Sequence, residues 1–370
     1  MSYVSYPRLE INLRKLKYNA KVEVESLKKI GIDVMGVNKV FDGAPETANA
    51  IFEGGIKAVA ESRVSNLKKI KDVKCEKALL RSPSLSEIPD VIRYADISLN
   101  SEIEVIEALS KEAVKQNKVH KVLLMLDLGD LREGIWFEDT DKIESVLRAI
   151  LKLPNIEIYG LGTNFNCYGT ALPTVKNGNK FVSIARDLEK KLGIKFKYLS
   201  GGNCTSYHLV DKGILPKGIN HLRIGGLHQF GIEYVEGKYL DEYYHSSMDI
   251  NKYVSNLYIF KAEIIELNTK PTVPVGELGV DAFLQTKTFV DRGNRKRALL
   301  AFGRQDIPYE NIHPIDSKIE ILGQTSDHTI IDIEDSDNYS LGDIIPFEID
   351  YTALLAACNS PGIEKAFIND

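Results

Sequence analysis

Short apolar runs alternate with helical patterns between about residue 30 and residue 226. Each run has the length of a buried strand and is rich in aliphatic residues. In chain order they read DVMGVNK, AVAES, KALLRS, ISLN, VLLMLDL, IEIYGLGTN, YLSGGN and HLRIGG. Eight strands that alternate with helices predict an α/β fold with a parallel sheet, and favour a (β/α)8 TIM-like barrel. A doubly wound sheet is the alternative, weakened because no G-x-G-x-x-G follows the first strand.

Two of the intervening stretches carry clear helix signals. Apolar residues recur at helical spacing ahead of the first strand, at Leu13, Leu16, Ala20, Val24 and Leu27. Ser101 and Glu104 match an S-x-x-E capping box, which predicts that a helix begins there.

The pattern changes after residue 250, where strand-like runs follow one another without long helical patterns between them. These runs are NLYIFKAEIIEL, RALLAF, KIEILG, HTIIDIE and DIIPFEID, and turn clusters such as DRGN and SLGD separate them. We therefore predict a barrel domain over residues 1–235 and a C-terminal mostly-β domain over residues 236–370, which the first few residues could join. The stretch 232–250, rich in Tyr, Glu and Asp, is the predicted connection.

The composition favours a soluble globular protein, with 44% hydrophobic and 27% charged residues among 370. A net charge of −5 gives no basic field, which argues against nucleic acid and anionic membranes as partners. No run of ~18 apolar residues and no apolar leader is present, so we expect no membrane span and a cytoplasmic location. No C-x-x-C pair occurs among the four cysteines, which speaks against a zinc or thioredoxin-type site: Cys75, Cys167, Cys204 and Cys358.

Candidate chemistry follows the strands, because barrels of this kind carry their active residues at the C-terminal strand ends. Lys39 ends the first strand, where partial desolvation disfavours its ammonium and leaves an amine able to form a Schiff base. A lysine that merely snorkels to solvent is the alternative. The glycine-bearing runs SGGNCTS and RIGG follow strands seven and eight, and their amides could hold a phosphate. Two tight turns that simply need glycine would look the same.

These pieces, in this order, resemble the alanine racemase family of pyridoxal 5'-phosphate (PLP) enzymes. GVNK resembles the cofactor-lysine strand, DLGDLREG the D-T-G-M-x-R-x-G segment, and HLRIGG the R-x-G-x motif. The resemblance implies that Lys39 carries PLP as a Schiff base, that Arg132 contacts the substrate carboxylate, and that Arg223 faces the pyridine nitrogen. It implies phosphate ligands at Gly225 and Gly226, with a looser match at Asn203, Thr205 and Ser206. From position alone, a loop arginine such as Arg132 is more often a surface residue.

A closer similarity is to the ornithine racemase branch of that family. The strings NKVFDGAPE, LGTNFNCYG, LSGGNCTSYHL, FGRQDI and DYTALLAACNSP resemble that branch. The similarity implies a racemase acting on a small amino acid, ornithine or another basic one, and a homodimer whose sites are completed by the partner's β domain. Lysine, arginine, alanine and serine stay open as substrates.

Several family residues are replaced here. The catalytic tyrosine of the G-Y-x-D motif falls at Arg304 in the run GRQD, the tyrosine soon after the lysine is Gly43, and the lysine that supports the arginine is Met125. The late P-Y turn reads Pro361-Gly362, without the phosphate-binding tyrosine.

The second base is therefore open. His328 is the first candidate because histidine titrates near neutrality, and Tyr351 and Cys358 follow. Asp327 and Asp306 could face the distal ammonium of a basic substrate, although acidic turn residues are more often solvated.

An arginine opposite the pyridine nitrogen disfavours protonation of that nitrogen, which weakens the electron sink and suits a racemase. Three other readings remain. They are a PLP lyase of the D-threonine aldolase type, which would also use a metal, a non-catalytic PLP-binding protein, and a barrel aldolase using Lys39 without PLP. No metal site is predicted, because no cluster has metal-ligand spacing.

Overall fold

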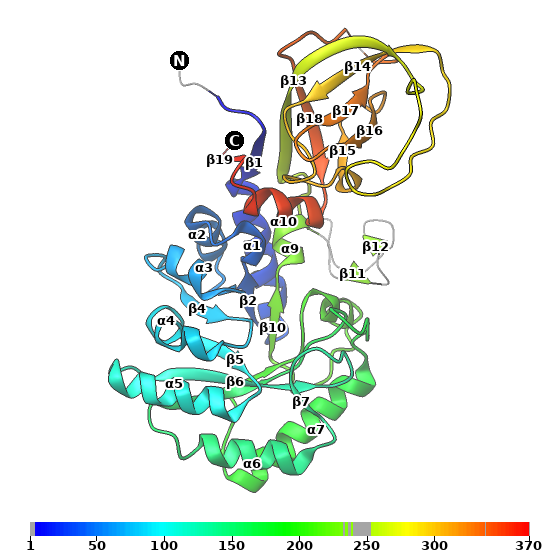
Figure 1. The fold of residues 1–370 in the computed structure, drawn as a ribbon. Helices are drawn as coiled ribbons and strands as arrows, with labels where there is room; N and C mark the ends of the chain where they lie inside the picture. Colours follow the sequence, from blue (N-terminus) through cyan, green and yellow to red (C-terminus); the bar gives the residue numbers. More distant parts are fainter. Residues whose placement is uncertain (1–3, 232–233, 236–237, 240–252, 337, 370) are drawn as a thin grey trace. The chain divides into compact units, whose positions relative to one another are not determined.

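The computed structural model describes residues 4–231, 234–235, 238–239, 253–336 and 338–369. The chain divides into two compact units (Figure 1), one formed by Leu13–Ser255 and the other by Met1–Asn12 with Asn256–Asp370. We call them the barrel unit and the β unit. The predicted boundary after residue 235 adjoins residues that the structure does not describe. Most of the predicted connection at 232–250 also lies outside the described residues, so the exact boundary stays a prediction.

Eight parallel strands close into a barrel in the barrel unit. Each strand pairs with the next, and β10 pairs with β2 to complete the ring. The strands are β2 (Asp33–Val37), β3 (Ala58–Glu61), β4 (Glu76–Leu79), β5 (Ile97–Asn100), β6 (His120–Asp127), β8 (Ile156–Gly162), β9 (Tyr198–Ser200) and β10 (His221–Ile224). The predicted (β/α)8 barrel is confirmed with all eight of its strands, and the doubly wound alternative is wrong because the sheet closes on itself.

Helices connect the strands and cover the barrel. They are α1 (Leu13–Lys28), α2 (Pro45–Glu53), α3 (Val64–Lys69), α4 (Ile88–Tyr94), α5 (Ile103–Lys115), α6 (Thr140–Ile150), α7 (Val175–Leu192), α8 (Tyr207–Asp211) and α9 (Gly226–Phe230). The predicted capping box is wrong: α5 begins after Glu102, without a side-chain cap, and Ser101 Oγ is buried with no hydrogen-bond partner. None of the described helices has the length and apolar character that crossing a bilayer requires.

The barrel unit has a buried apolar cluster formed by residues of its strands. The members of this cluster are Met35, Val37, Ala58, Ala60, Ala78, Ile97, Leu99, Leu123, Met125 and Tyr159. A Cβ on Gly162 would lie 2.6 Å from Met125 Sδ and 3.5 Å from Arg223 Nη1, so this glycine makes room for both side chains. Arg223 therefore lies beside the apolar layer, at the end of the barrel where the strands terminate.

The β unit is a mostly antiparallel sheet in the order β15-β18-β13-β14-β17-β16, and β1 joins β13 to β19. Its strands are β1 (Arg8–Asn12), β13 (Tyr258–Pro271), β14 (Asn294–Leu300), β15 (Ile312–Pro314), β16 (Glu320–Gln324), β17 (Thr329–Asp332), β18 (Ile344–Ile349) and β19 (Glu364–Ile368). The predicted β domain is confirmed. The sequence did not predict β15, β19 or the helix α10 (Tyr351–Asn359).

Candidate active site

Lys39 lies at the mouth of the barrel, two residues after β2 ends. It begins a 3-10 turn, Lys39–Phe41, and its side chain is half-buried. The chain then bends through Asp42 and Gly43, whose φ angles are +50° and +72°. A Cβ on Gly43 would lie 2.8 Å from the Asn66 Cα, which explains why a glycine, and no larger residue, stands four positions after the lysine.

Two backbone amides converge on one point at the start of α9. The N–H groups of Gly225 and Gly226 donate to Cys204 Sγ, with N···S distances of 3.2 Å and 2.9 Å. Burial raises the pKa of the Cys204 thiol, and the two amides and the Lys39 ammonium act in the opposite direction. Two adjacent N–H groups aimed at one atom are suited to an oxygen of a phosphate.

The loop after β9 is held together by the three residues that the family resemblance assigned loosely to phosphate binding. Asn203 Oδ1 accepts from the N–H and hydroxyl of Thr205 at 2.9 Å and 2.8 Å, and Asn203 Nδ2 donates to the Phe165 carbonyl at 2.7 Å. Ser206 Oγ donates to the Gly201 carbonyl at 2.9 Å. These contacts fix the loop that carries Cys204, a residue the sequence analysis did not single out. A direct role in phosphate binding stays a prediction for all three.

Arg223 is a buried cation whose hydrogen-bond partners are neutral. Nη1 donates to Ser200 Oγ at 2.6 Å and Nη2 donates to the Thr163 carbonyl at 2.7 Å. Burial lowers its pKa to about 10, Glu133 acts against this, and the nearby Arg132 cation adds to it. No carboxylate among the described residues pairs with this guanidinium, so it places a positive charge in a low-dielectric mouth, where it acts strongly on a bound ring.

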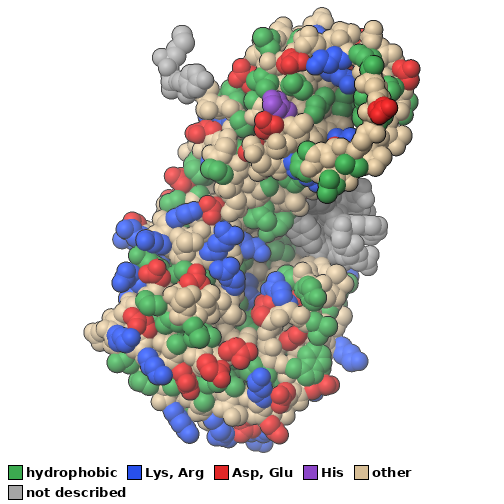
Figure 2. Space-filling view, in the orientation of Figure 1, with side chains coloured by type: hydrophobic (Ala, Val, Ile, Leu, Met, Phe, Trp, Pro, Cys, Tyr) green, Lys and Arg blue, Asp and Glu red, His purple; other side chains and the backbone are tan. Residues whose placement is uncertain are grey.

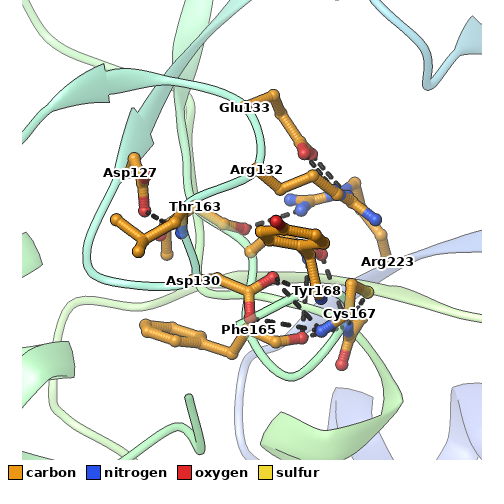
Figure 3. A network of polar contacts seen from close by, with 12 residues as sticks. Asp127, Asp130, Arg132, Glu133, Thr163, Phe165, Cys167, Tyr168 and Arg223 are labelled. Carbon is orange, nitrogen blue, oxygen red and sulfur yellow. Dashed lines mark hydrogen bonds and ion pairs between the residues drawn. The ribbon is translucent and has the colours of Figure 1, made fainter. Parts of the chain in front are cut away.

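Arg132 belongs to a loop after β6 that two aspartates hold in place (Figure 3). Asp127 Oδ1 accepts from the Gly129 N–H at 2.9 Å, and the buried Asp130 carboxylate accepts from the Cys167 N–H at 3.2 Å. Arg132 Nε and Nη2 both donate to the neighbouring Glu133 carboxylate, which raises the pKa of Arg132. The guanidinium thus already makes the bidentate carboxylate contact predicted for a substrate. Glu133 was not among the site residues predicted from the sequence.

His328 lies in the β unit, in the turn between β16 and β17. Its Nδ1 lies 2.9 Å from Asp327 Oδ1, and this contact lowers the pKa of Asp327. The backbone N–H of Arg304 donates to the Thr325 carbonyl at 3.0 Å. The structure thus brings the GRQD run, which replaces the family's tyrosine motif, against the turn that carries His328.

The other candidates in the β unit are placed differently. Tyr351 begins α10, while Cys358 is buried in the same helix. Asp306 is also buried and accepts from Ser360 Oγ at 2.8 Å, whereas Asp327 is exposed. Within the described residues, no three His, Cys, Asp or Glu side chains gather as ligands of a metal ion would.

The donor set of the barrel mouth fits PLP. An amine, a pair of amides and a buried guanidinium match the aldehyde, the phosphate and the ring nitrogen of that cofactor. The comparison with known families agrees, because the family described as "Alanine racemase, N-terminal domain" matches residues 11–229, more than half of the chain. The chain belongs to the alanine racemase family. The resemblance predicted from the motifs is therefore confirmed.

Two relatives of the family match over almost the full length. The chain is 42% identical over 364 residues to the ornithine racemase of Acetoanaerobium sticklandii, which covers 98% of this chain and 100% of that protein. It is 35% identical over 365 residues to the lysine racemase of Thermotoga maritima, at 98% of each chain.

Solved structures of other proteins share the fold at low sequence identity. The alanine racemase of the D-cycloserine producer Streptomyces lavendulae aligns with a TM-score of 0.77 at 15% identity, over 99% of this chain and 98% of that one. The D-threonine aldolase of Filomicrobium marinum aligns at 0.64 and 13% identity, over 96% and 90%. Since both enzyme types share the fold, the fold alone does not separate a racemase from that lyase.

Proposed function

We propose that this protein interconverts the L and D forms of a basic amino acid with PLP as cofactor, and that ornithine is its first candidate substrate. Sequence identity across both whole chains carries the proposal, at 42% to an ornithine racemase and 35% to a lysine racemase. By contrast, the alanine racemase of Clostridium tetani matches only 52% of this chain at 26% identity. The chain is an amino acid racemase, and a basic side chain is favoured over alanine.

In this proposal the barrel mouth holds the cofactor. Lys39 binds the aldehyde carbon, the Gly225 and Gly226 amides bind the phosphate, and Arg223 faces the ring nitrogen. When bound, PLP makes the proton on the substrate Cα acidic by withdrawing electron density. The Arg223 charge disfavours a proton on that nitrogen, which keeps the electron withdrawal moderate. Arg132 binds the substrate carboxylate after its contact with the Glu133 carboxylate is broken.

In the proposed homodimer, Lys39 of one protomer and His328 of the other would move the proton at Cα. The Lys39 amine serves one face, and His328 serves the other through Nε2, because its Nδ1 is held by Asp327 at 2.9 Å. A histidine with one nitrogen fixed by a carboxylate is oriented for proton transfer at the other. Asp327, which is exposed, is also suited to meet the distal ammonium of ornithine or lysine.

A homodimer is part of the proposal, and one exposed loop supports it. Between β13 and β14 the chain presents large apolar side chains to solvent (Figure 2): Val275, Leu278, Val280, Phe283, Leu284, Phe289 and Val290. Val275 and Leu284 are 93% and 82% exposed. Exposed apolar groups in this number are typical of a surface that binds another chain. A cytoplasmic location stays a prediction from the sequence.

The activity is tested by incubating the purified holoenzyme with L-ornithine, L-lysine and L-alanine and separating the enantiomers by chiral chromatography. We expect the D enantiomer of a basic amino acid to form fastest, and no product from the Lys39→Ala variant. The same enzyme preparation is also incubated with D-threonine in a separate reaction. Release of glycine from D-threonine, with the basic amino acids unchanged, would instead make this protein a lyase and overturn the proposal.

Co-expression of two inactive variants tests the shared site. A heterodimer of Lys39→Ala and His328→Asn chains has one site with both changes and one site with neither, if each site takes Lys39 and His328 from different chains. Random pairing then restores about a quarter of the wild-type activity per site. No restoration in a verified heterodimer would place both residues in one chain's site, whereas a His328→Asn homodimer with wild-type activity would exclude His328 as the second base.

A further inference from the structure

Glu61 is an enclosed carboxyl group at the end of β3 that the proposed chemistry does not use. Its side chain is 0% exposed. Asn38 Nδ2 donates to its Oε1 at 2.7 Å and Asn66 Nδ2 donates to its Oε2 at 3.3 Å. Among the described residues no cation forms an ion pair with it. A buried carboxyl that has amides as its only hydrogen-bond partners is uncommon and costly, so its presence needs an explanation.

The stronger of these two bonds leads directly to Lys39. Asn38 immediately precedes the lysine and is itself 0% exposed. Its Oδ1 accepts from Thr47 Oγ1 at 2.8 Å, and its backbone N–H donates to the Ala60 carbonyl at 2.8 Å. Both ends of the Asn38 amide and its backbone are therefore held. Because the Asn38 carbonyl also accepts from the Phe41 N–H at 3.0 Å, the turn that starts at Lys39 is built on this residue.

We propose that Glu61 is a positioning residue for Lys39, which acts through Asn38 to fix the turn that presents the amine to the cofactor and makes that presentation depend on pH. The inference rests on the proposed function, since it takes Lys39 as the point of PLP attachment. Glu61 does not touch the cofactor. Glu61 acts on Lys39 through the side-chain amide of Asn38, the residue that precedes the lysine.

The pH dependence follows from the two amide donors. Burial raises the pKa of Glu61 to about 7, the Asn38 and Asn66 amides act against this, and the charged groups near it are Asp42, which raises the pKa, and Lys69, which lowers it. Lys69 also pairs with Asp42 at 2.7 Å. The carboxylate accepts from both amides. The protonated acid has a hydroxyl that faces an N–H donor, so one of the two bonds is lost as the pH falls.

The test compares the wild type with Glu61→Gln, which keeps the size of the side chain and removes its titration. The dissociation constant for PLP and the fraction of Lys39 fixed to PLP by borohydride, by mass spectrometry, are measured from pH 6 to pH 9. We expect the ratio of the variant to the wild-type dissociation constant to be near one at pH 6 and about tenfold at pH 8, because a charge-assisted hydrogen bond has that effect. The ratio also cancels the titration of PLP itself.

Two further variants complete the test. Glu189→Gln makes the same change at another largely buried glutamate. Its carboxylate accepts from the Phe196 N–H and pairs with Arg186 and Lys195, none of which belongs to the turn after β2, so its ratio should stay at one across the range. Thr47→Val removes the hydroxyl that holds Asn38 Oδ1 and leaves Glu61 in place. It should weaken PLP binding at every pH without shifting the midpoint of the pH dependence of the PLP dissociation constant.

The outcomes separate the inference from the proposed function. A folded Glu61→Gln variant whose ratio is constant with pH, while wild-type Lys39 carries PLP, would overturn the inference alone. If Glu61→Gln does not fold, unchanged PLP binding in Thr47→Val overturns it. A wild-type protein that places no PLP on Lys39 would overturn both.

Discussion

Replacing Glu61 by glutamine should remove a pH-dependent loss of stability from the cofactor-free protein. The folded-state pKa is about 7, against an ordinary value of 4.5, because burial disfavours the anion. A group with a raised folded pKa stabilises the fold fully below its unfolded pKa, and this contribution is lost as the pH rises through the folded value. The shift, 7 − 4.5, corresponds to about 3 kcal/mol of unfolding free energy, lost between about pH 4.5 and pH 7.

Two buried histidines oppose this trend in the same pH range. Burial lowers the pKa of His120 to about 4 and of His221 to about 3, from 6.5. Groups with depressed folded pKa values of this kind destabilise the fold as the pH falls below 6.5, since the unfolded chain takes up the proton. The raw stability curve of the wild type therefore hides the contribution of Glu61. The difference between variant and wild type reveals it, because both proteins keep both histidines.

The assay is urea unfolding of the apoprotein at pH 5, 6, 7 and 8. Fluorescence of Trp136, the single tryptophan, reports on the barrel unit that contains Glu61. The stability of Glu61→Gln relative to the wild type should rise by about 2–3 kcal/mol from pH 5 to pH 8, while Glu189→Gln shows no such slope. Parallel curves for Glu61→Gln and the wild type would refute the reasoning, because they would mean that Glu61 titrates as an exposed carboxyl does.

Three further changes test other parts of the structure. Arg223→Met should weaken PLP binding at least tenfold, as measured by an absorbance titration. It should leave the unfolding free energy of the apoprotein within about 1–2 kcal/mol of the wild type in urea titrations, because the buried cation has neutral partners. Gly160→Ala should lower the melting temperature by several degrees, since a Cβ there would lie 2.0 Å from the Tyr198 carbonyl oxygen; calorimetry showing no change would contradict it. Val275→Ser with Leu284→Ser should shift sedimentation toward the monomer, and an unchanged dimer would remove this loop from the interface.

The barrel was predictable because its strands are buried on both faces. Parallel strands covered by helices give continuous apolar runs, and eight such runs are present in the amino-acid sequence. The strands β1 and β19 gave no such signal. They are five residues each, and they pair Arg8 with Glu364 across nearly the whole chain, so no local pattern reports the partnership. The helix α10 carried a signal that could have been used, because Asp350 caps it by accepting from the Ala353 N–H.

The candidate site was predictable where a residue's place in the chain decides its place in space. Lys39 and the glycines after β10 follow strand ends, and strand ends meet at one side of a barrel. The contacts of Cys204 and Glu133 were not predictable in this way. Cys204 meets the amides of Gly225 and Gly226 from a different loop, so the contact depends on the closure of the barrel. Glu133 adjoins Arg132, but adjacency in sequence does not say that both side chains turn to the same side.

The spacing between charges explains why a carboxyl group can support Lys39 without disabling it. A carboxylate in direct contact with the lysine would favour the ammonium, which cannot attack an aldehyde. Glu61 contacts Asn38 instead. The amide of Asn38 is held in place by the carboxyl group, and it keeps the Glu61 carboxylate apart from the Lys39 side chain. The same logic applies to Arg223, which is held by Ser200 and Thr163 rather than by an acid. Arg223 thus stays available to a ring nitrogen. Among Lys39, Arg132 and Arg223, the ion pairs of the described residues include an acid for Arg132 alone, the most exposed of the three, and a substrate carboxylate can displace that acid.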